Sequence, residues 1–164
     1  MARKTNFKGS PLAVLGNEIK AGSKAPAFKL TANDMSDITE ATYAGKKIVL
    51  LSFPSLDTPV CSLETKKFNQ EAAKFDDQIK VIAVSRDLPF AQKRWCGTEG
   101  VENILTTSDY KYRTFGESFG VLIQDWQLLS RAVFIINADG VVKYVEYVDE
   151  ISSEPDYEKV LKAI

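Results

Sequence analysis

Two apolar runs of strand length, separated by a helical pattern, constrain the fold more than any other feature of this chain. Residues 47–53 and 79–85 are rich in Val, Ile or Leu, and both runs predict buried strands. Between them apolar residues recur at near-helical spacing, at Val60, Leu63, Phe68, Ala72 and Phe75. This order predicts a βαβ unit. A right-handed crossover makes the two strands parallel and places the turn after residue 53 at the carboxyl edge of the sheet, where open α/β sheets hold their ligand sites.

A β-hairpin is predicted towards the end of the chain. Residues 130–137 and 141–148 are rich in Val, Ile and Tyr, and turn residues at 138–140 separate them. An antiparallel pair beside the parallel unit makes the sheet mixed, so the expected fold class is α/β. At the front of the chain, turn residues within 7–20 predict a second, smaller hairpin.

Three helices are expected after the first one. They are residues 89–96, ended by Gly97 and Gly100; residues 112–119; and a last helix that begins at Ser152 or Ser153 with Pro155. The last helix carries one apolar stripe, made of Tyr157, Val160, Leu161 and Ile164.

Length, composition and charge limit the classes of function. With 164 residues, 45% of them hydrophobic, the chain suits one compact domain spanning 1–164. The net charge of -1 leaves no basic excess for nucleic acid or an anionic membrane surface. No apolar stretch approaches the about 20 residues of a membrane span, and residues 1–7 lack the apolar region of a secretory signal. We therefore expect a cytoplasmic protein.

The chain has no histidine and only two cysteines. The missing imidazole excludes Ser-His-Asp and Cys-His catalysis and histidine metal ligation. Two cysteines cannot build a four-thiolate zinc site or the disulfide framework of a small secreted protein. Thiol chemistry remains, with Cys61 and Cys96 either inert core thiols or a redox pair.

Cys61 occupies a position that favours reactivity. Thr58 is expected to cap a helix whose first residue is Pro59, which places Cys61 in the first turn. The free backbone N–H groups and the helix dipole there favour an anion, so they favour the thiolate over the thiol. Residue type alone gives an inert, buried cysteine about even odds. The position at the end of a strand favours the reactive alternative.

Cys96 and Arg131 each have two possible interpretations, one structural and one functional. Cys96 closes its predicted helix beside Trp95 and Phe90, which resemble core residues, so a structural thiol is expected unless Cys61 is active. Arg131 opens a predicted strand, and spacing alone favours a solvent-facing charge that protects the strand from aggregation. The alternative is a cation that stabilises the thiolate and holds a peroxide oxygen.

The Cys61 segment also resembles a known family. Pro54, Thr58 and Cys61 match the Pro-x-x-x-Thr-x-x-Cys motif of peroxiredoxins, and residues 55–61 are similar to the bacterial thiol peroxidase subfamily, whose members are atypical two-cysteine peroxiredoxins. Further similar segments are spread along almost the whole chain: 22–28, 67–69, 87–92, 94–97, 130–133, and 148–151 with 154–155. The resemblance implies a thioredoxin-like fold, with a mixed central sheet flanked by helices and an N-terminal β-hairpin.

The resemblance also implies a role for each site residue. Cys61 is expected to be the peroxidatic cysteine, which forms a sulfenic acid, and Cys96 the resolving cysteine, which closes an intrachain disulfide. Thr58 and Arg131 are expected to align the peroxide, while Pro54 shields the thiolate from water. Hydrogen peroxide and alkyl or lipid hydroperoxides are the implied substrates and thioredoxin the implied reductant. A homodimer is expected, and no metal or organic cofactor is needed.

Two alternative functions come from other classes. A thioredoxin-like dithiol oxidoreductase would suit the same fold, but its Cys-x-x-Cys motif would need a cysteine at position 64, where this chain has Glu64. A non-catalytic module would bind a protein through the apolar residues 119–123 with Trp126, Leu128 and Leu129. The same residues also suit a dimer interface or one wall of a hydrophobic substrate pocket.

Helix geometry predicts that the disulfide requires motion. Cys96 lies about 10 Å along its helix from Pro89, at 1.5 Å per residue. A disulfide needs Cα atoms about 4.4–6.8 Å apart, so the pair is expected to be too distant in the reduced fold. Oxidation should therefore unravel residues 57–64, residues 94–100, or both.

Overall fold

A seven-stranded mixed sheet forms the centre of the computed structural model, which describes residues 3–164; Met1 and Ala2 of the expected domain lie outside the described residues. The strand order is β10-β9-β5-β6-β7-β3-β4. The strands are β3 (Lys29–Ala32), β4 (Asp37–Thr39), β5 (Lys47–Ser52), β6 (Ile79–Ser85), β7 (Leu105–Ser108), β9 (Ala132–Ile136) and β10 (Val142–Tyr147).

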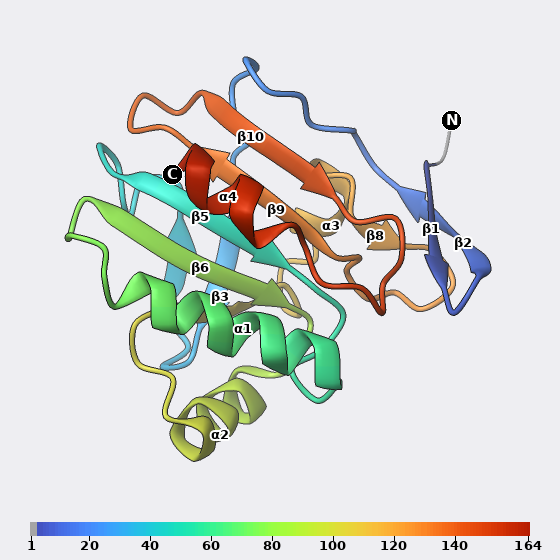
Figure 1. Cartoon of the computed structure of the whole chain (residues 1–164). Helices are drawn as coiled ribbons and strands as arrows, with labels where there is room; N and C mark the ends of the chain where they lie inside the picture. The colour runs from blue at the N-terminus through green and yellow to red at the C-terminus, as the bar shows by residue number, and fades with distance from the viewer. Residues whose placement is uncertain (1–2) are drawn as a thin grey trace.

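The predicted βαβ unit is confirmed. Strands β5, β6 and β7 are parallel, α1 (Pro59–Ala72) connects β5 to β6, and α2 (Pro89–Glu99) connects β6 to β7. Strand β9 pairs antiparallel with β10, which confirms the predicted hairpin. On its other side β9 pairs antiparallel with β5. The amino end of α1 lies beside the carboxyl ends of β5 and β6 (Figure 1).

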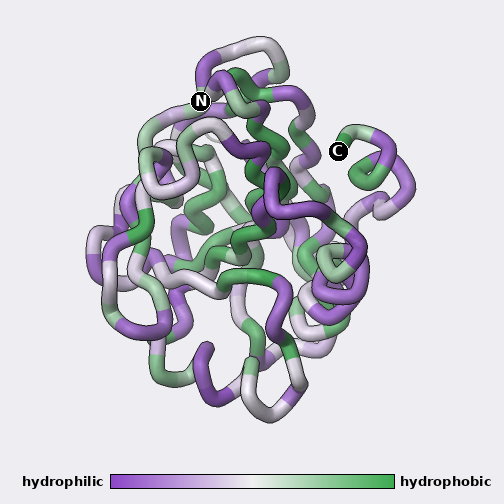
Figure 2. Tube along the Cα trace, turned by 90° about the vertical axis from the view of Figure 1, so that its left-hand side faces the viewer, coloured by the Kyte–Doolittle hydropathy of each residue, from purple (hydrophilic) through white to green (hydrophobic). Residues whose placement is uncertain are grey.

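Side chains of β5 alternate between the two faces of the sheet. Val49 and Leu51 pack in one apolar cluster with residues of α1 and α4 (Tyr157–Ala163), whereas Leu50 belongs to a second cluster that includes Phe115 of α3 (Phe115–Ser118). Figure 1 shows the corresponding layers, with α1 and α4 in front of the sheet and α3 behind it. Hydrophobic segments concentrate in the central strands, while hydrophilic ones gather in the outer loops (Figure 2).

The N-terminal hairpin belongs to a second, three-stranded sheet. It consists of β1 (Arg3–Phe7) and β2 (Ser10–Leu15), and β2 pairs with β8 (Leu122–Ile123). The expected hairpin is confirmed, but it begins at Arg3, ahead of the expected residues 7–20. Its turn is tight because Lys8 and Gly9 both have positive φ, 50° and 83°.

Helix α2 is longer than predicted. It continues through Gly97 to Glu99 and ends at Gly100, whose φ of 68° is left-handed. A glycine adopts this conformation without steric cost and commonly terminates a helix, whereas one inside a helix is only mildly unfavourable. The prediction that Cys96 closes the helix was therefore wrong.

Helix α3 is much shorter than the predicted residues 112–119. It contains only Phe115–Ser118. Arg113 lies just ahead of it with a φ of 59°, a left-handed conformation that a helix cannot include. Both ends of the predicted range, Tyr112 and Phe119, therefore lie outside the helix.

The last helix begins later than predicted. Neither Ser152 nor Ser153 caps it; the N-cap is Asp156, whose carboxylate accepts a hydrogen bond from the backbone N–H of Lys159 at 3.2 Å. Val160 is buried and packs against the α1 side of the sheet, as the apolar stripe predicted. Among residues 3–164, no helix has the length and apolar character to cross a membrane.

Candidate active site

Cys61 lies in the first turn of α1, at the carboxyl end of β5. Thr58 is the N-cap and Pro59 the first helical residue, so Cys61 is the third residue of the helix, as predicted. The Thr58 side chain makes no capping bond; its hydroxyl donates to the carbonyl of Ser55 at 2.9 Å. The Cys61 side chain is fully buried.

Arg131 approaches Cys61 from the neighbouring strand. It immediately precedes β9, and the pairing of Ser52 with Ala132 places it at the carboxyl end of β5. Its Nη2 lies 3.1 Å from the Cys61 Sγ, and only 1% of the residue is exposed. The solvent-facing alternative for Arg131 was therefore wrong. A buried guanidinium at hydrogen-bond distance stabilises negative charge on sulfur.

Glu64 completes a buried cluster of ionisable side chains that the sequence reasoning missed. Its Oε1 lies 3.5 Å from Nη1 of Arg131, and its side chain is fully buried. Burial raises the pKa of Glu64 to about 8, although the charge and hydrogen bond of Arg131 oppose the rise. Residues three apart share one face of a helix, so the spacing from Cys61 was the available signal.

The third contact of Arg131 comes from the end of the chain. Its Nε donates to the carbonyl of Ile151 at 2.9 Å. The backbone N–H of Ile151 in turn donates to the carbonyl of Asn6 in the N-terminal hairpin, at 2.8 Å. The guanidinium is thus oriented by α1, by the segment after β10 and, indirectly, by β1.

An apolar pocket of about 410 Å³ lies against this cluster. It is lined by Phe7, Lys8, Pro54, Ser55, Thr58, Pro59, Val60, Trp126, Leu128, Arg131, Ile151 and Ser152. Three predicted site residues, Pro54, Thr58 and Arg131, therefore meet at one cavity. Trp126 forms part of the wall, as one interpretation of the sequence expected, and Phe7 packs edge-on against it with ring centroids 5.1 Å apart.

Cys96 lies in a separate environment on α2. Its Sγ is 3.4 Å from Oγ1 of Thr106, whose hydroxyl donates to Oδ1 of Asn33 at 3.1 Å. Since the Thr106 proton is committed to Asn33, Thr106 accepts the S–H of Cys96. Partial burial raises the pKa of the Cys96 thiol. Both cysteines are free: Cys96 packs against the apolar cluster that contains Cys61, but its hydrogen-bond partner is Thr106, whereas that of Cys61 is Arg131.

The surroundings of Cys96 match the sequence only in part. Trp95 packs against the core on the α1 side, as expected. Phe90 does not: it is 68% exposed, so its assignment to the core was wrong. Its position next to the first helical residue directs the ring outwards, while Pro89 and Gln92 form the buried face of α2.

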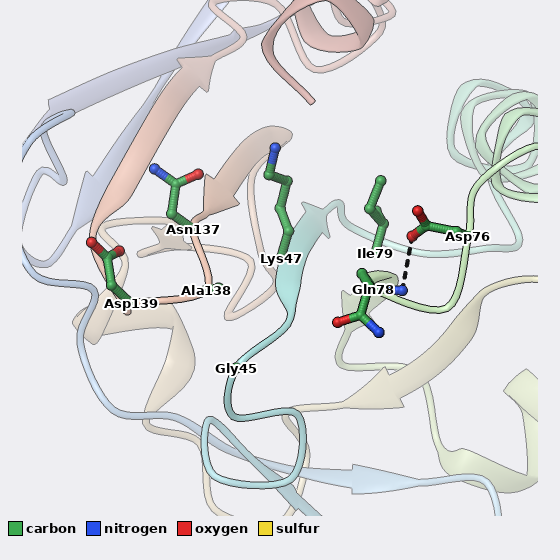
Figure 3. A pocket seen from close by; sticks show the side chains of 8 residues that line it. All are labelled: Gly45, Lys47, Asp76, Gln78, Ile79, Asn137, Ala138 and Asp139. Atoms are coloured by element: carbon green, nitrogen blue, oxygen red, sulfur yellow. Dashed lines mark hydrogen bonds between the residues drawn. The ribbon is translucent and has the colours of Figure 1, made fainter.

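A larger hollow, of about 640 Å³, lies at the opposite end of the sheet from Cys61 (Figure 3). Its lining is Gly45, Lys47, Asp76, Gln78, Ile79, Asn137, Ala138 and Asp139. These residues surround the amino ends of β5 and β6, and Gln78 donates a backbone hydrogen bond to Asp76 there. Neither cysteine lines this hollow or the apolar pocket, but the pocket is lined by Arg131, whose guanidinium contacts the Cys61 sulfur, so the smaller apolar pocket is the better candidate for thiol chemistry.

Comparison with known proteins identifies the family of the chain. The family model described as Redoxin matches residues 20–161. The chain belongs to the Redoxin family. Thiol peroxidases from Halalkalibacterium halodurans and Bacillus subtilis are 52% and 44% identical to this Redoxin-family chain, over 96% of it and 94% and 93% of their own lengths. The crystal structure of a peroxiredoxin-like protein from Aquifex aeolicus, 42% identical, has a TM-score of 0.92 and covers 99% of this chain and 95% of that one.

A more distant structure extends the likeness of fold. A thiol peroxidase from Chromobacterium violaceum is 21% identical and has a TM-score of 0.88, with 97% of this chain and 93% of that chain covered. Because its curated relatives of high identity are thiol peroxidases, the Redoxin-family chain is a thiol-dependent peroxidase. Its fold is thioredoxin-like. The non-catalytic alternative was therefore wrong. The segment proposed to bind its partner is largely core, since Phe119, Val121, Leu122, Ile123 and Leu129 are all buried.

Proposed function

We propose that this peroxidase reduces hydrogen peroxide and organic hydroperoxides through a sulfenic acid on Cys61. Cys96 resolves that intermediate as an intrachain disulfide, and thioredoxin reduces the disulfide. The observation that carries the proposal is the 3.1 Å contact between Nη2 of buried Arg131 and Sγ of Cys61, beside an apolar pocket.

In the first step the Cys61 thiolate attacks one oxygen of the peroxide. An S–O bond forms, the O–O bond breaks, and the departing oxygen leaves with a proton as water or an alcohol, so sulfur is oxidised and the peroxide reduced. The N–H groups of Arg131 stabilise the charge that develops on oxygen. Thr58 has committed its own proton to Ser55, so its oxygen is free to accept a hydrogen bond from the peroxide O–H. Pro54 lines the same pocket and limits access of water.

In the second step Cys96 attacks the Cys61 sulfur. Its thiolate forms the S–S bond, and the sulfenic hydroxyl leaves as water after taking up a proton. Cys96 must first leave Thr106, and its raised pKa keeps it a thiol until then. Thioredoxin then supplies two electrons and two protons by thiol–disulfide exchange, which restores both thiols.

The pocket supports alkyl and lipid hydroperoxides as substrates beside hydrogen peroxide. Phe7, Trp126 and Leu128 give it aromatic and aliphatic walls, and burial of an alkyl group against them is favourable. The proposed chemistry takes place on sulfur and needs no metal or organic cofactor. By family resemblance, we also propose that the enzyme is a homodimer and works in the cytoplasm, where thiol reductants are abundant.

The alternative is a thioredoxin-like dithiol oxidoreductase. That activity uses a second thiol three residues after the first. Here the residue at that position is Glu64, buried against Arg131. The geometry around Cys61 therefore favours the peroxidase mechanism.

A peroxide consumption assay tests the proposal. Hydrogen peroxide, a small alkyl hydroperoxide and a lipid hydroperoxide are each compared with thioredoxin, its reductase and NADPH as the reducing system. We expect turnover of all three, abolished in Cys61→Ser. In Cys96→Ser we expect one turnover and then loss of thioredoxin-dependent cycling. Full cycling in Cys96→Ser would contradict the intrachain disulfide, and activity in Cys61→Ser would contradict the whole mechanism.

A further inference from the structure

One carboxylate connects the loop before Cys61 to the start of α2. Asp87 lies between the end of β6 and the first residue of α2. Its Oδ1 accepts a hydrogen bond from the Ser55 hydroxyl at 2.6 Å, and its Oδ2 accepts one from the Leu56 backbone N–H at 2.9 Å. A third bond comes from the Ser85 hydroxyl to Oδ2, at 2.7 Å. Hydrogen bonds to an ionised carboxylate are about twice as strong as neutral ones.

Ser55 passes this constraint on to Thr58. The carbonyl of Ser55 accepts hydrogen bonds from both the backbone N–H and the hydroxyl of Thr58, at 3.1 Å and 2.9 Å. The Ser55 hydroxyl also accepts a bond from the backbone N–H of Asp57, at 3.1 Å. Asp87 therefore fixes the turn that orients the Thr58 hydroxyl at the pocket and begins the helix of Cys61.

The same network attaches α2 to the sheet. Gln92 of α2 is buried, and its Nε2 donates to Ser85 Oγ at 3.1 Å and to the carbonyl of Thr107 at 2.7 Å. Ser85 is thus shared, since it donates to Asp87 and accepts from Gln92. The helix that carries Cys96 and the loop that precedes Cys61 are held by one connected set of bonds.

We propose that Asp87 is a positioning residue that holds the Cys61 loop in its peroxide-reactive conformation and opposes the rearrangement that brings Cys61 and Cys96 together. This inference rests on the proposed sulfenic acid and disulfide mechanism. Each cysteine has its own partner, Arg131 or Thr106, and each must leave it before the S–S bond forms. The contacts of Asp87 with Ser55 and Leu56 hold the loop directly ahead of residues 57–64, so they resist the unfolding of that segment.

The proposal predicts opposite effects on the two chemical steps. Without Asp87 the Thr58 turn is less ordered, so oxidation of Cys61 by peroxide becomes slower. The same loss removes bonds that resist rearrangement, so conversion of the sulfenic acid to the disulfide becomes faster. A residue with a purely structural role would not shift two sequential steps in opposite directions.

Rapid mixing with acid quench and mass spectrometry measures both steps in the full-length protein, with hydrogen peroxide as the probe. The variants are Asp87→Ala, Ser55→Ala, the double variant and, as a matched control, Asp77→Ala, an exposed aspartate at the far end of β6. We expect Asp87→Ala to slow oxidation about tenfold or more and to speed disulfide closure. Asp77→Ala should leave both rates unchanged. The double variant should be no worse than Asp87→Ala, because both single changes break the same bond.

Equal rates in Asp87→Ala and wild type, a parallel fall in both steps, or additive effects in the double variant would overturn the inference. If Asp87→Ala does not fold, Ser55→Ala decides the question. It removes the 2.6 Å bond to Asp87 and the 3.1 Å bond from the Asp57 N–H, keeps the bonds of Asp87 to Leu56 and Ser85, and is expected to change the two rates in the same opposite directions. The wild-type reaction separates this failure from failure of the proposed function. Wild type that forms no Cys61 sulfenic acid or no Cys61–Cys96 disulfide contradicts the mechanism, whatever the variants do.

Discussion

At the scale of single residues, the counterion of Arg131 is the central question. Two groups lie within reach of its guanidinium, the Glu64 carboxyl and the Cys61 sulfur. Because burial raises the pKa of Glu64 to about 8, this carboxyl is largely neutral at pH 7. The guanidinium of Arg131 is therefore available to stabilise negative charge on the Cys61 sulfur, 3.1 Å away. Because the Glu64 carboxyl is neutral, it does not neutralise the positive charge of Arg131 beside Cys61.

Replacing Arg131 tests the role of the buried cation. We expect Arg131→Met to lower the fraction of thiolate at neutral pH and to slow peroxide reduction by roughly 100- to 1000-fold, because it removes a preorganised donor from the reacting atoms. Thiolate absorbance titrated against pH and stopped-flow oxidation measure the two effects. Lys67→Met is the control, since Lys67 is an exposed cation on the same helix. An unchanged titration in Arg131→Met would refute the role.

Glu64 predicts an unusual pH dependence of stability. Its pKa is raised on folding, so between the unfolded value of 4.5 and about 8 the folded chain keeps a proton that the unfolded chain releases. Stability of the reduced protein should fall across this window by up to about 1.4 kcal/mol per pH unit from this group. Glu64→Gln should remove the slope, so its stability relative to wild type rises from pH 5 to pH 8. Urea unfolding at four pH values measures this, and parallel curves would contradict it.

Single residues differed in how well the sequence predicted them. The position of Cys61 was predictable because Thr58 and Pro59 mark a helix start locally. The burial of Arg131 was not, because it depends on the pairing of β9 with β5, whose partners, such as Ser52 and Ala132, are 80 or more positions apart in the sequence. Spacing alone therefore favoured a surface charge, and only the family resemblance pointed to the site.

At the scale of elements, the longer strands were predictable from their residue patterns, whereas the short strands were not. The runs that form β5, β6 and β9 are mostly apolar, the run that forms β10 is rich in Val and Tyr, and each was found from its pattern. Strands β3, β4, β7 and β8 have four residues or fewer, and strands of this length leave no readable alternation. Their pairing is decided by tertiary contacts.

Hydrogen exchange tests the motion expected of two elements. Disulfide formation requires the first turn of α1 and the end of α2 to leave the partners of Cys61 and Cys96. We expect amides of residues 57–64 and 94–100 to exchange faster in the disulfide form than in the reduced form, while β5 and β6 stay protected in both. Equal protection of these two segments in both forms would contradict the rearrangement.

At the scale of the whole molecule, the site depends on segments distant in sequence. The Redoxin match begins at residue 20, so the N-terminal hairpin lies ahead of the matched range. Nevertheless Phe7 of this hairpin lines the pocket, and Asn6 holds the segment whose Ile151 orients Arg131. The hairpin is thus part of the candidate active site, although its sequence carries no catalytic motif.

The hairpin should influence which peroxide the enzyme prefers. Phe7→Ala removes one aromatic wall of the pocket beside Trp126. We expect kcat/KM for a bulky organic hydroperoxide to fall on the order of tenfold, because apolar contact with the alkyl group is lost, while hydrogen peroxide is much less affected. Phe90→Ala, at an exposed ring of α2, is the control. An equal loss with both peroxides would exclude a role in selectivity.

The most direct test of the mechanism is to identify the oxidised cysteine. Each single-cysteine variant is treated with peroxide in the presence of dimedone, which traps sulfenic acids, and the labelled residue is identified by mass spectrometry. The geometry of Arg131 predicts rapid labelling of Cys61 in Cys96→Ser and no comparable labelling in Cys61→Ser. Rapid labelling of Cys96 in Cys61→Ser, with Cys61 unlabelled in Cys96→Ser, would reverse the two roles and contradict the proposed mechanism.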